Sequence, residues 1–374
     1  MPSTRIKKIP YQLVEKGKIS SLKKRAEIKE GASLLKQGDV VAFPTETVYG
    51  LGADATNSQA VKKIFSAKGR PQDNPLIVHI GSRLQLANMV KGEIPTLADS
   101  LIKSFWPGPL TIIFNKSNLI PDRTTAGLET VGIRMPSHPV ALALIQKAGC
   151  PIAAPSANSS GFPSPTRAKH VYSDLKNRIP YIIDGGHCEV GVESTVLSIT
   201  GGFPTILRPG GITRQEIERV IDRKVVFSEN LKGEGETDRE DTIPISPGMK
   251  YRHYSPSTSL KLVEPLNPKN IKQICKLIEQ LNVEKVALIL TEESKELIKR
   301  ELYKCLNSKE KVKLISMGSK QKPTLIAHDI FAFLRQYDSN EIGLIIVESI
   351  PREGLGEAVM NRLHKAATDY IYFN

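Results

Sequence analysis

The chain has few of the features that mark membrane, secreted or zinc-binding proteins. No apolar run approaches the length of a membrane-spanning helix, and no apolar segment of signal-peptide length follows the basic N-terminus. Its four cysteines, Cys150, Cys188, Cys275 and Cys305, lie far apart without a C-x-x-C pair. These absences predict a cytoplasmic protein with reduced, structural cysteines and with neither a disulfide framework nor a metal site.

Two familiar nucleotide-binding motifs are also missing. Neither GxxxxGKS/T nor a GxGxxG that follows a strand occurs in the sequence, so ATP, if it binds, must bind by another route. No Ser-His-Asp or Cys-His arrangement stands out, which argues against an enzyme-bound covalent intermediate. No cluster of Asp and Glu marks a metal site either.

The formal net charge of +13 over 374 residues is concentrated at one end. Residues 1–30 contain nine Lys or Arg against three Glu, whereas residues 31–250 contain 24 basic against 21 acidic residues. The first segment is typical of a solvated amphipathic lead-in more than of a specific RNA site. The length predicts two domains.

One segment, residues 40–53, carries most of the functional signal. The apolar run 40–43 predicts a strand that Pro44 ends, and polar side chains follow at once in Thr45, Glu46 and Thr47. Glycines then let the backbone turn. A buried strand therefore delivers polar groups to its end.

Two cations follow the next predicted helix, residues 58–67. We expect this helix to stop at Gly69, because Pro71 disfavours helical geometry at Arg70. Lys68 and Arg70 then lie beside a predicted strand, 76–80, that carries His79. The pair forms either a phosphate or carboxylate site or merely the solvated end of a capped helix. The role of His79 has two equally favoured interpretations, as a substrate ligand or as a core residue.

Three later segments have the same character. Arg134 lies in an apolar stretch, where a charge is costly and implies an anionic partner. A predicted strand at 152–154 ends in small residues followed by Ser156 and Asn158. The segments GVESTV and LRPG add Ser194 and Arg208.

Together these motifs identify a family. PTETVYGLG, the Lys-x-Arg of Lys68 and Arg70, the Ser-x-Asn of Ser156 and Asn158, GVESTV, and SPGMKYRHYSP at 246–256 resemble the threonylcarbamoyl-AMP synthase family in its long two-domain form. The resemblance implies that L-threonine, bicarbonate or CO₂, and ATP become threonylcarbamoyl-AMP and pyrophosphate. It also implies Mg²⁺ with ATP, and a product passed to a tRNA threonylcarbamoyl transferase complex, with possible weak RNA contact.

The resemblance also implies a set of site residues. Lys68 and Arg70 would be catalytic, stabilising developing phosphate charge. The residues implied to bind L-threonine are Thr45, Thr47, His79, Arg134, Ala154 and Ser194. The residues implied to bind ATP are Lys68, Arg70, Asn74, Thr130, Ser156, Asn158, Ser164, Arg208, Tyr251 and Tyr254.

The fold expected is α/β in both domains. The boundaries are a basic lead-in at 1–27, a YrdC-like catalytic domain at 28–227, a linker or lid at 228–257 and a C-terminal domain at 258–374. The resemblance implies that the first domain is a YrdC-like twisted open mixed sheet with helices. In the second, regular strand and helix alternation predicts a doubly wound parallel three-layer Rossmann-like domain.

The remaining candidates are given structural roles. Trp106 is interpreted as an anchor under a Pro-rich turn, with adenine stacking as the alternative. His138, His170 and His187 have no functional context. Two rival functions remain: an RNA-binding module without turnover, and a carbamoylation enzyme like the hydrogenase-maturation carbamoyltransferases, whose cysteine-rich zinc segments this chain lacks.

Overall fold

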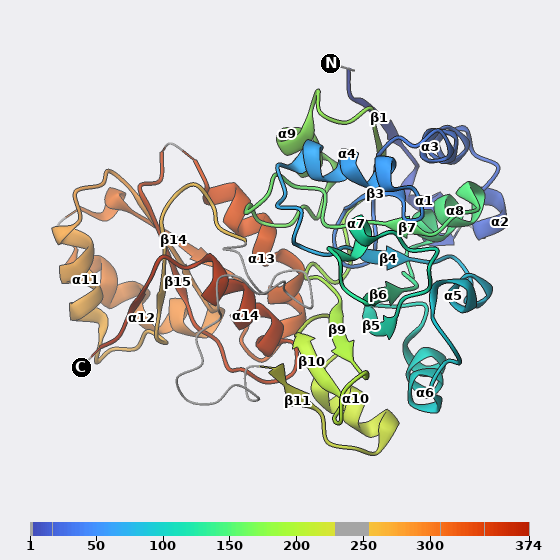
Figure 1. The fold of residues 1–374 in the computed structure, drawn as a ribbon. Coiled ribbons are helices and arrows are strands. Elements are labelled where there is room, and N and C mark those ends of the chain that lie inside the picture. The colour runs from blue at the N-terminus through green and yellow to red at the C-terminus, as the bar shows by residue number, and fades with distance from the viewer. Residues whose placement is uncertain (1–2, 17, 229–253, 307, 340, 374) are drawn as a thin grey trace. The chain divides into compact units, whose positions relative to one another are not determined.

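The computed structural model describes residues 3–16, 18–228, 254–306, 308–339 and 341–373 (Figure 1). The chain forms two compact units. The N-terminal unit contains Met1–Ser160 and Ser164–Tyr251, and the C-terminal unit contains Gly161–Pro163 and Arg252–Asn374. A large mixed sheet in the first and a parallel sheet in the second confirm the predicted α/β class.

The N-terminal unit is built on one mixed sheet. Its strands in the described residues are β1 (Arg5–Lys8), β2 (Val41–Phe43), β3 (Gly50–Asp54), β4 (Ile77–His79), β5 (Leu110–Asn115), β6 (Thr130–Arg134), β7 (Ile152–Ala153), β8 (Tyr181–Asp184), β9 (Thr195–Ser198), β10 (Thr205–Arg208) and β11 (Val226–Phe227). Their spatial order is β1-β8-β2-β3-β7-β4-β6-β5-β9-β10-β11. Strands from distant parts of the sequence are therefore neighbours.

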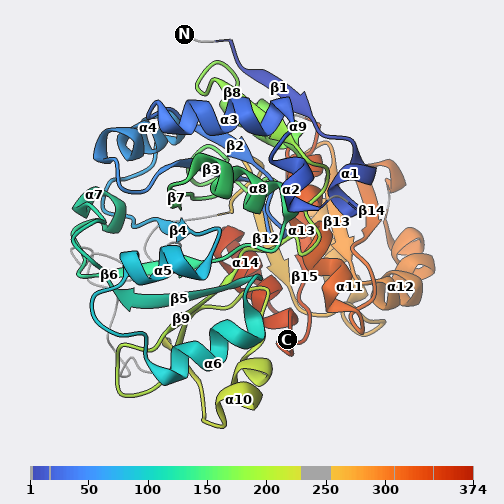
Figure 2. The ribbon, with the colours of Figure 1, turned by 90° about the vertical axis from the view of Figure 1, so that its right-hand side faces the viewer.

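Helices cover this sheet from two sides, and each side has its own apolar core. The helices are α1 (Tyr11–Lys16), α2 (Ile19–Leu22), α3 (Ala26–Lys36), α4 (Ser58–Lys68), α5 (Arg83–Met89), α6 (Thr96–Phe105), α7 (Asp122–Thr125), α8 (Pro139–Ala148), α9 (Ala168–Leu175) and α10 (Arg214–Ile221). One core gathers α2, α3 and α8 (Figure 2), and the other includes α4, α5, α6 and α10. The buried faces hold the sheet rigid beneath its loops.

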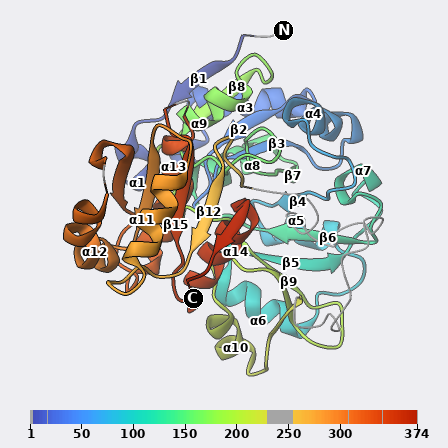
Figure 3. The same ribbon diagram turned by 90° about the vertical axis from the view of Figure 1, so that its left-hand side faces the viewer.

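Part of the basic lead-in belongs to the sheet. Strand β1 pairs in parallel with β8 at the sheet edge (Figure 3). Its four side chains are exposed. Ile9, Val14 and Leu22 then enter the core. The segment is thus amphipathic, as predicted, and its basic side chains also suit an edge strand that must not pair with another chain.

Helix α4 ends where the sequence predicts. Asn57 caps its first turn by accepting hydrogen bonds from the N–H groups of Gln59 and Ala60. At the other end Gly69 is left-handed, with φ of 64°. A glycine there turns the chain without strain and leaves Lys68 and Arg70 on either side of the turn.

The C-terminal unit is a three-layer parallel α/β domain. Its strands are β12 (Leu260–Val263), β13 (Val286–Leu290), β14 (Val312–Ser316), β15 (Leu344–Glu348) and β16 (Asp369–Ile371), in the order β14-β13-β15-β12-β16. Its helices are α11 (Ile271–Gln280), α12 (Glu292–Cys305), α13 (Pro323–Tyr337) and α14 (Gly356–Ala366), with a 3-10 turn at Lys309–Lys311. All strand pairs are parallel. This is the alternation of strands and helices that the sequence predicts, and β16 and the 3-10 turn are too short to show a period in it.

The structure corrects one expectation about the cysteines. Cys275 of α11 and Cys305 of α12 form a disulfide, with 6.4 Å between their Cα atoms, while Cys150 and Cys188 are free. The two cysteines are 30 residues apart, and only the packing of α11 against α12 brings them together.

Two further expectations can be compared only with the residues that the structure describes. Most of the predicted linker or lid, including Tyr251, lies outside them. Among the helices that are described, none is both long and apolar enough to cross a bilayer.

Candidate active site

Residues 44–49, which connect β2 to β3, lie at the centre of the candidate site, and we call this segment the hub. Two loops make three hydrogen bonds with its backbone. From the loop between β8 and β9, the N–H of Val190 donates to the carbonyl of Glu46 over 2.7 Å. In the loop between β7 and α9, the N–H of Ala157 donates to the carbonyl of Tyr49 over 2.8 Å, and the carbonyl of Pro165 accepts from the N–H of Tyr49 over 2.8 Å. Loops that lie more than a hundred residues along the chain therefore meet the PTETVYG motif.

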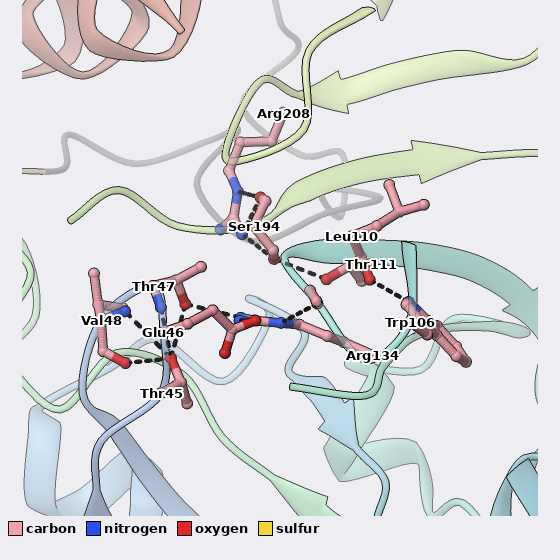
Figure 4. A network of polar contacts seen from close by, with 11 residues as sticks. Thr45, Glu46, Thr47, Val48, Trp106, Leu110, Thr111, Arg134, Ser194 and Arg208 are labelled. Atoms are coloured by element: carbon pink, nitrogen blue, oxygen red, sulfur yellow. Dashed lines mark hydrogen bonds and ion pairs between the residues drawn. The ribbon is translucent and has the colours of Figure 1, made fainter. Parts of the chain in front are cut away.

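Arg134, at the end of β6, points into this hub (Figure 4). Its Nη1 donates to Thr47 Oγ1 over 2.9 Å and its Nε donates to the carbonyl of Gly108 over 3.2 Å. The hydroxyls of Thr45 and Thr47 are 2.8 Å apart, and Thr45 Oγ1 donates to the carbonyl of Val48 over 2.7 Å. Because the Thr45 proton is used there, Thr47 donates to Thr45, and the network runs in one direction from Arg134.

The buried charge of Arg134 has an anionic partner within the chain, as its apolar setting implies. Glu46 Oε1 lies 2.6 Å from Arg134 Nη2, and each side chain is 4% exposed. Burial alone would raise the pKa of the Glu46 carboxyl, but the charge of Arg134 outweighs it and lowers that pKa below its ordinary value. The pair is therefore charged.

His79 lies beside this pair and is neutral. It is the parallel register partner of Arg134, on β4 beside β6. Burial, assisted by the charge of Arg134, lowers the His79 pKa to about 3. Its Nδ1 is buried without a hydrogen-bond partner among the described residues. A buried ring nitrogen of this kind is unusual in a purely structural histidine, which favours the ligand alternative.

A second group surrounds the start of β9 (Figure 4). Arg208 Nη2 donates to the Ser194 carbonyl over 3.0 Å, and Ser194 Oγ lies 2.8 Å from Thr111 Oγ1 on β5. The preceding residue, Glu193, accepts a 2.5 Å hydrogen bond from the Ser164 hydroxyl. The predicted residues Ser164, Ser194 and Arg208 are thus brought together.

The third group joins Lys68 to the loop after β7. Lys68 is 3% exposed, and its ammonium donates to the Ser156 carbonyl over 2.6 Å and to the Asn158 carbonyl. Arg70 Nη2 donates to Asn74 Oδ1 over 2.6 Å. Lys68 is therefore buried, and Arg70 is partly exposed and hydrogen-bonded, which favours a site over a merely solvated helix end.

Three predicted residues stand apart from these contacts. Thr130 begins the strand that Arg134 ends, so their Cα atoms are on the order of 13 Å apart along β6. Ala154 is buried directly after β7 and offers only backbone groups. Tyr254 is packed inside the C-terminal unit, with its ring 5.3 Å from that of Phe331 and with Arg362 over it. This packing speaks against Tyr254 as a nucleotide ligand.

The structure adds Glu46, Thr111 and Glu193, which sequence reasoning did not assign. Glu46 had a signal, because an Arg in an apolar stretch calls for a carboxylate and Glu46 stands between two candidate threonines. Thr111 had none. Trp106 is a structural anchor as predicted: its Nε1 donates to the Leu110 carbonyl over 2.6 Å. His138 accepts the N–H of Val140 as the cap of α8.

The chemistry of this arrangement suits anions. Lys68, Arg134 and Arg208 are each at most 6% exposed, and carbonyl, hydroxyl and carboxylate groups hold them in place. Cations fixed in a water-poor setting stabilise negative charge strongly, because no solvent has to reorganise around them. The fold and the buried cations are those of an α/β protein suited to bind negatively charged substrates.

Comparison with known proteins identifies the family. Residues 33–210 match the family described as "Telomere recombination", and residues 212–368 match "Threonylcarbamoyl-AMP synthase, C-terminal domain". The chain is 49% identical to the threonylcarbamoyl-AMP synthase of Bacillus subtilis, over 91% of this chain and 93% of the other. That of Pyrococcus abyssi is 44% identical over 91% and 94%.

Solved structures agree. The crystal structure of Pyrococcus abyssi Sua5 complexed with L-threonine has a TM-score of 0.81 and 40% identity, covering 100% of both chains. The chain belongs to the threonylcarbamoyl-AMP synthase family, as the sequence motifs indicate.

Proposed function

We propose that this protein is an L-threonylcarbamoyladenylate synthase. It combines L-threonine, bicarbonate or CO₂, and ATP into threonylcarbamoyl-AMP and pyrophosphate, the first step of threonylcarbamoyl-adenosine formation in tRNA. The observation that carries the proposal is the match to synthases of this name over 91% of the chain. The cluster of buried cations supports it.

The chemistry explains the demand for cations. The amine of threonine adds to CO₂ to form a carbamate, and a carbamate oxygen attacks the α-phosphate of ATP while pyrophosphate leaves. Both reactants are anionic, so fixed positive charge must offset their repulsion. The site must also exclude water, which would favour loss of the carbamate.

For threonine, we assign the carboxylate to Arg134. Its guanidinium has five N–H groups, of which two donate the hydrogen bonds to Thr47 and Gly108, and one edge faces Glu46. The remaining N–H groups suit the two oxygens of a carboxylate. The amine and hydroxyl of threonine would be bound by His79 Nδ1 and by the hydroxyls of Thr45, Thr47 and Ser194. Ala154 would line the site.

For ATP, we assign the phosphates to Lys68, Arg70 and Arg208. The neighbouring Asn74, Ser156, Asn158 and Ser164 position these cations or contact the nucleotide, and Thr130 remains a predicted contact. Tyr251 lies outside the described residues, and Tyr254 is not favoured. Hydrogen bonds to the threonine hydroxyl would select against valine, which cannot make them.

Mg²⁺ is proposed to arrive with ATP. The buried carboxylates of the site are engaged, Glu46 with Arg134 and Glu193 with Ser164. The residues therefore fit an ion held mainly by the triphosphate, where it would neutralise phosphate charge. Transfer of the product to a tRNA threonylcarbamoyl transferase complex, weak RNA contact and a cytoplasmic location also remain predictions.

One incubation tests the proposal. The purified chain is given radiolabelled bicarbonate, L-threonine and ATP, and we expect a labelled adenylate with equimolar pyrophosphate. Valine in place of threonine is the matched control and should give far less product. ATP-independent tRNA binding with no labelled adenylate would favour the RNA-binding module instead.

A further inference from the structure

A separate cavity lies in the C-terminal unit. Its volume is about 230 Å³, and it opens at the carboxyl ends of three parallel strands, β12, β15 and β16. It is lined by residues that follow these strands and by α14, among them Glu264, Arg352, His364, Tyr370 and Tyr372. None of these residues belongs to the candidate active site.

The topology explains why a cavity forms here. Strands β12 and β15 are parallel neighbours, but the chain leaves them in opposite directions across the sheet, toward β13 and toward β16. Right-handed crossovers in opposite directions place α11 and α14 on opposite faces. The loops after β12 and β15 therefore diverge, and crevices between such loops are where open α/β sheets bind ligands.

The position at the end of β15, between the segments that follow β12 and β13, is already filled by a side chain of the protein. Glu348, at the end of β15, is 1% exposed. Its carboxylate accepts hydrogen bonds from the N–H groups of Leu266 and Thr291, and from the hydroxyls of Thr291 and Ser294 at the start of α12. An internal carboxylate thus occupies the position at this helix end that a ligand anion would take. The cavity on the β16 side is the one left open.

Its wall combines aromatic rings with a cation. The rings of His364, Tyr370 and Tyr372 lie in a row, which we call the ladder. The ring centroids of His364 and Tyr370 are 5.1 Å apart. Those of Tyr370 and Tyr372 are 6.4 Å apart, and these two ring planes are inclined by only 22°. Tyr370 Oη donates to the His364 carbonyl over 3.1 Å and so accepts from His364 Nδ1 over 2.8 Å, which fixes the inner rings. Tyr372, the outer ring, is 70% exposed.

The cation is Arg352, on the loop after β15. Its side chain is 47% exposed, and among the described residues its contact is a 3.3 Å ion pair with Glu357. A guanidinium has five N–H groups, so most of its donors remain for an anion. Glu264, on the loop after β12, supplies an exposed carboxylate that can accept hydroxyl protons.

We propose that this cavity is a second ligand site, for a planar aromatic ring that carries an anionic group, and that its ligand is a purine nucleoside monophosphate. The base stacks on Tyr372 at the open end of the ladder. Arg352 pairs with the phosphate, and Glu264 accepts from the ribose hydroxyls. The site is distinct from the one that carries the proposed synthase reaction.

Photolabelling of the full chain with 8-azido-AMP tests the site, because the position of the label separates it from the active site. Trypsin cleaves after Lys365 and releases the C-terminal peptide 366–374, which contains Tyr370 and Tyr372. We expect this peptide to be labelled and AMP to prevent the labelling. Adenosine, inorganic phosphate and benzoate should each compete at least about tenfold less well, since each lacks part of the recognised chemistry.

Two variants and a matched control complete the experiment. Arg352→Gln and Tyr372→Ala change exposed side chains, and each should raise the AMP concentration for half-maximal competition by about tenfold. Arg300→Gln, an exposed arginine on α12 outside the cavity, should match the wild type. Label confined to the N-terminal unit, or equal competition in all variants, would overturn the site. Benzoate or adenosine competing as well as AMP would overturn the nucleotide assignment.

Discussion

At the scale of single residues, the Glu46–Arg134 ion pair decides the electrostatics of the candidate site. Two charges that are each 4% exposed pay a large desolvation cost, which close pairing offsets. Burial keeps His79 neutral, and the Arg134 cation adds to this effect because it disfavours a second positive charge beside it. A neutral imidazole can accept or donate a hydrogen bond at working pH, which suits substrate recognition.

The first prediction concerns Arg134→Lys. Lysine keeps the charge but loses the planar two-pronged geometry that matches a carboxylate. We expect the KM for threonine to rise about tenfold or more while the KM for ATP changes little. Steady-state pyrophosphate release measures both. Equal weakening of both substrates, or a lowered melting temperature with intact kinetics, would make Arg134 a purely structural partner of Glu46.

The second prediction concerns Lys68 and Arg70. Replacing either by alanine removes a positive charge at the end of α4, and each should cost about 2–4 kcal/mol of transition-state stabilisation in kcat/KM. Lys62→Ala, an exposed lysine on the same helix, is the control and should keep its activity. Wild-type rates of pyrophosphate release in both variants would remove these residues from the chemistry.

The third prediction is a pH dependence of stability. Burial lowers the pKa of His79 to about 3 and that of His138 to about 4, below the ordinary value of 6.5. The unfolded chain therefore binds more protons below pH 6.5. The unfolding free energy should be highest above pH 6.5 and fall as the pH drops toward 4, by up to about 1.4 kcal/mol per pH unit for each histidine.

Urea denaturation across this pH range measures the effect. His79→Gln removes one titrating group, so the slope between pH 6 and pH 4.5 should become shallower. An unchanged slope in this variant would show that His79 is protonated in the folded protein.

At the scale of elements, strand and helix ends bring the site together. Arg134 and Arg208 end strands, Ser194 precedes one, and Lys68 is the last residue of α4. Side chains at such ends are held by a rigid element yet can reach a ligand. Glycines in the adjoining turns are required for two different reasons.

The fourth prediction separates these two reasons. At Gly210 a Cβ would overlap the backbone of Glu193, Ser194 and Thr195. At Gly69 a Cβ would meet no atom within 4 Å, and the only cost would be the strain of a non-glycine residue at a φ of 64°. Gly69→Ala should therefore cost about 1 kcal/mol of stability with activity retained. Gly210→Ala should displace Ser194 and Arg208 and abolish activity.

Thermal unfolding and pyrophosphate release, measured on both variants, check this contrast. An active Gly210→Ala variant would show that the loop after β10 can move away from β9 without loss of the site.

At the scale of the whole molecule, each unit has apolar clusters of its own among the described residues. Those of the N-terminal unit draw on residues between Ile9 and Phe227, and one in the C-terminal unit draws on residues between Val263 and Phe373. Apolar clusters within one unit favour its independent folding. The domain boundaries predicted from the sequence remain a prediction that truncation can test.

The fifth prediction is that a chain ended after Ser228 folds but is poorly active. It keeps β11, which pairs with β10, and the two large apolar clusters of the N-terminal unit. It loses the linker, where Tyr251, Arg252 and His253 provide aromatic and cationic groups suited to closing over a nucleotide. Circular dichroism and labelled-adenylate formation test this. Turnover equal to that of the full chain would rule out a role for the linker.

The sequence by itself determined the family, the α/β class and most of the elements. Periodicity and turn residues report on local structure, so the end of α4 at Gly69 and the alternation of the C-terminal unit were predictable. The motifs also named many of the buried polar residues at the candidate site, but not Glu46, Thr111 or Glu193 as ligands or partners. These signals lie within short windows of sequence.

Only the tertiary structure decided which residues contact one another. Glu46 and Arg134 are 88 residues apart, and Thr111 reaches Ser194 across neighbouring strands. The disulfide of Cys275 with Cys305 and the aromatic cavity beside β16 likewise depend on how elements pack. Such contacts arise from the order of strands in a sheet, which a linear pattern does not encode, because many pairings satisfy the same local preferences.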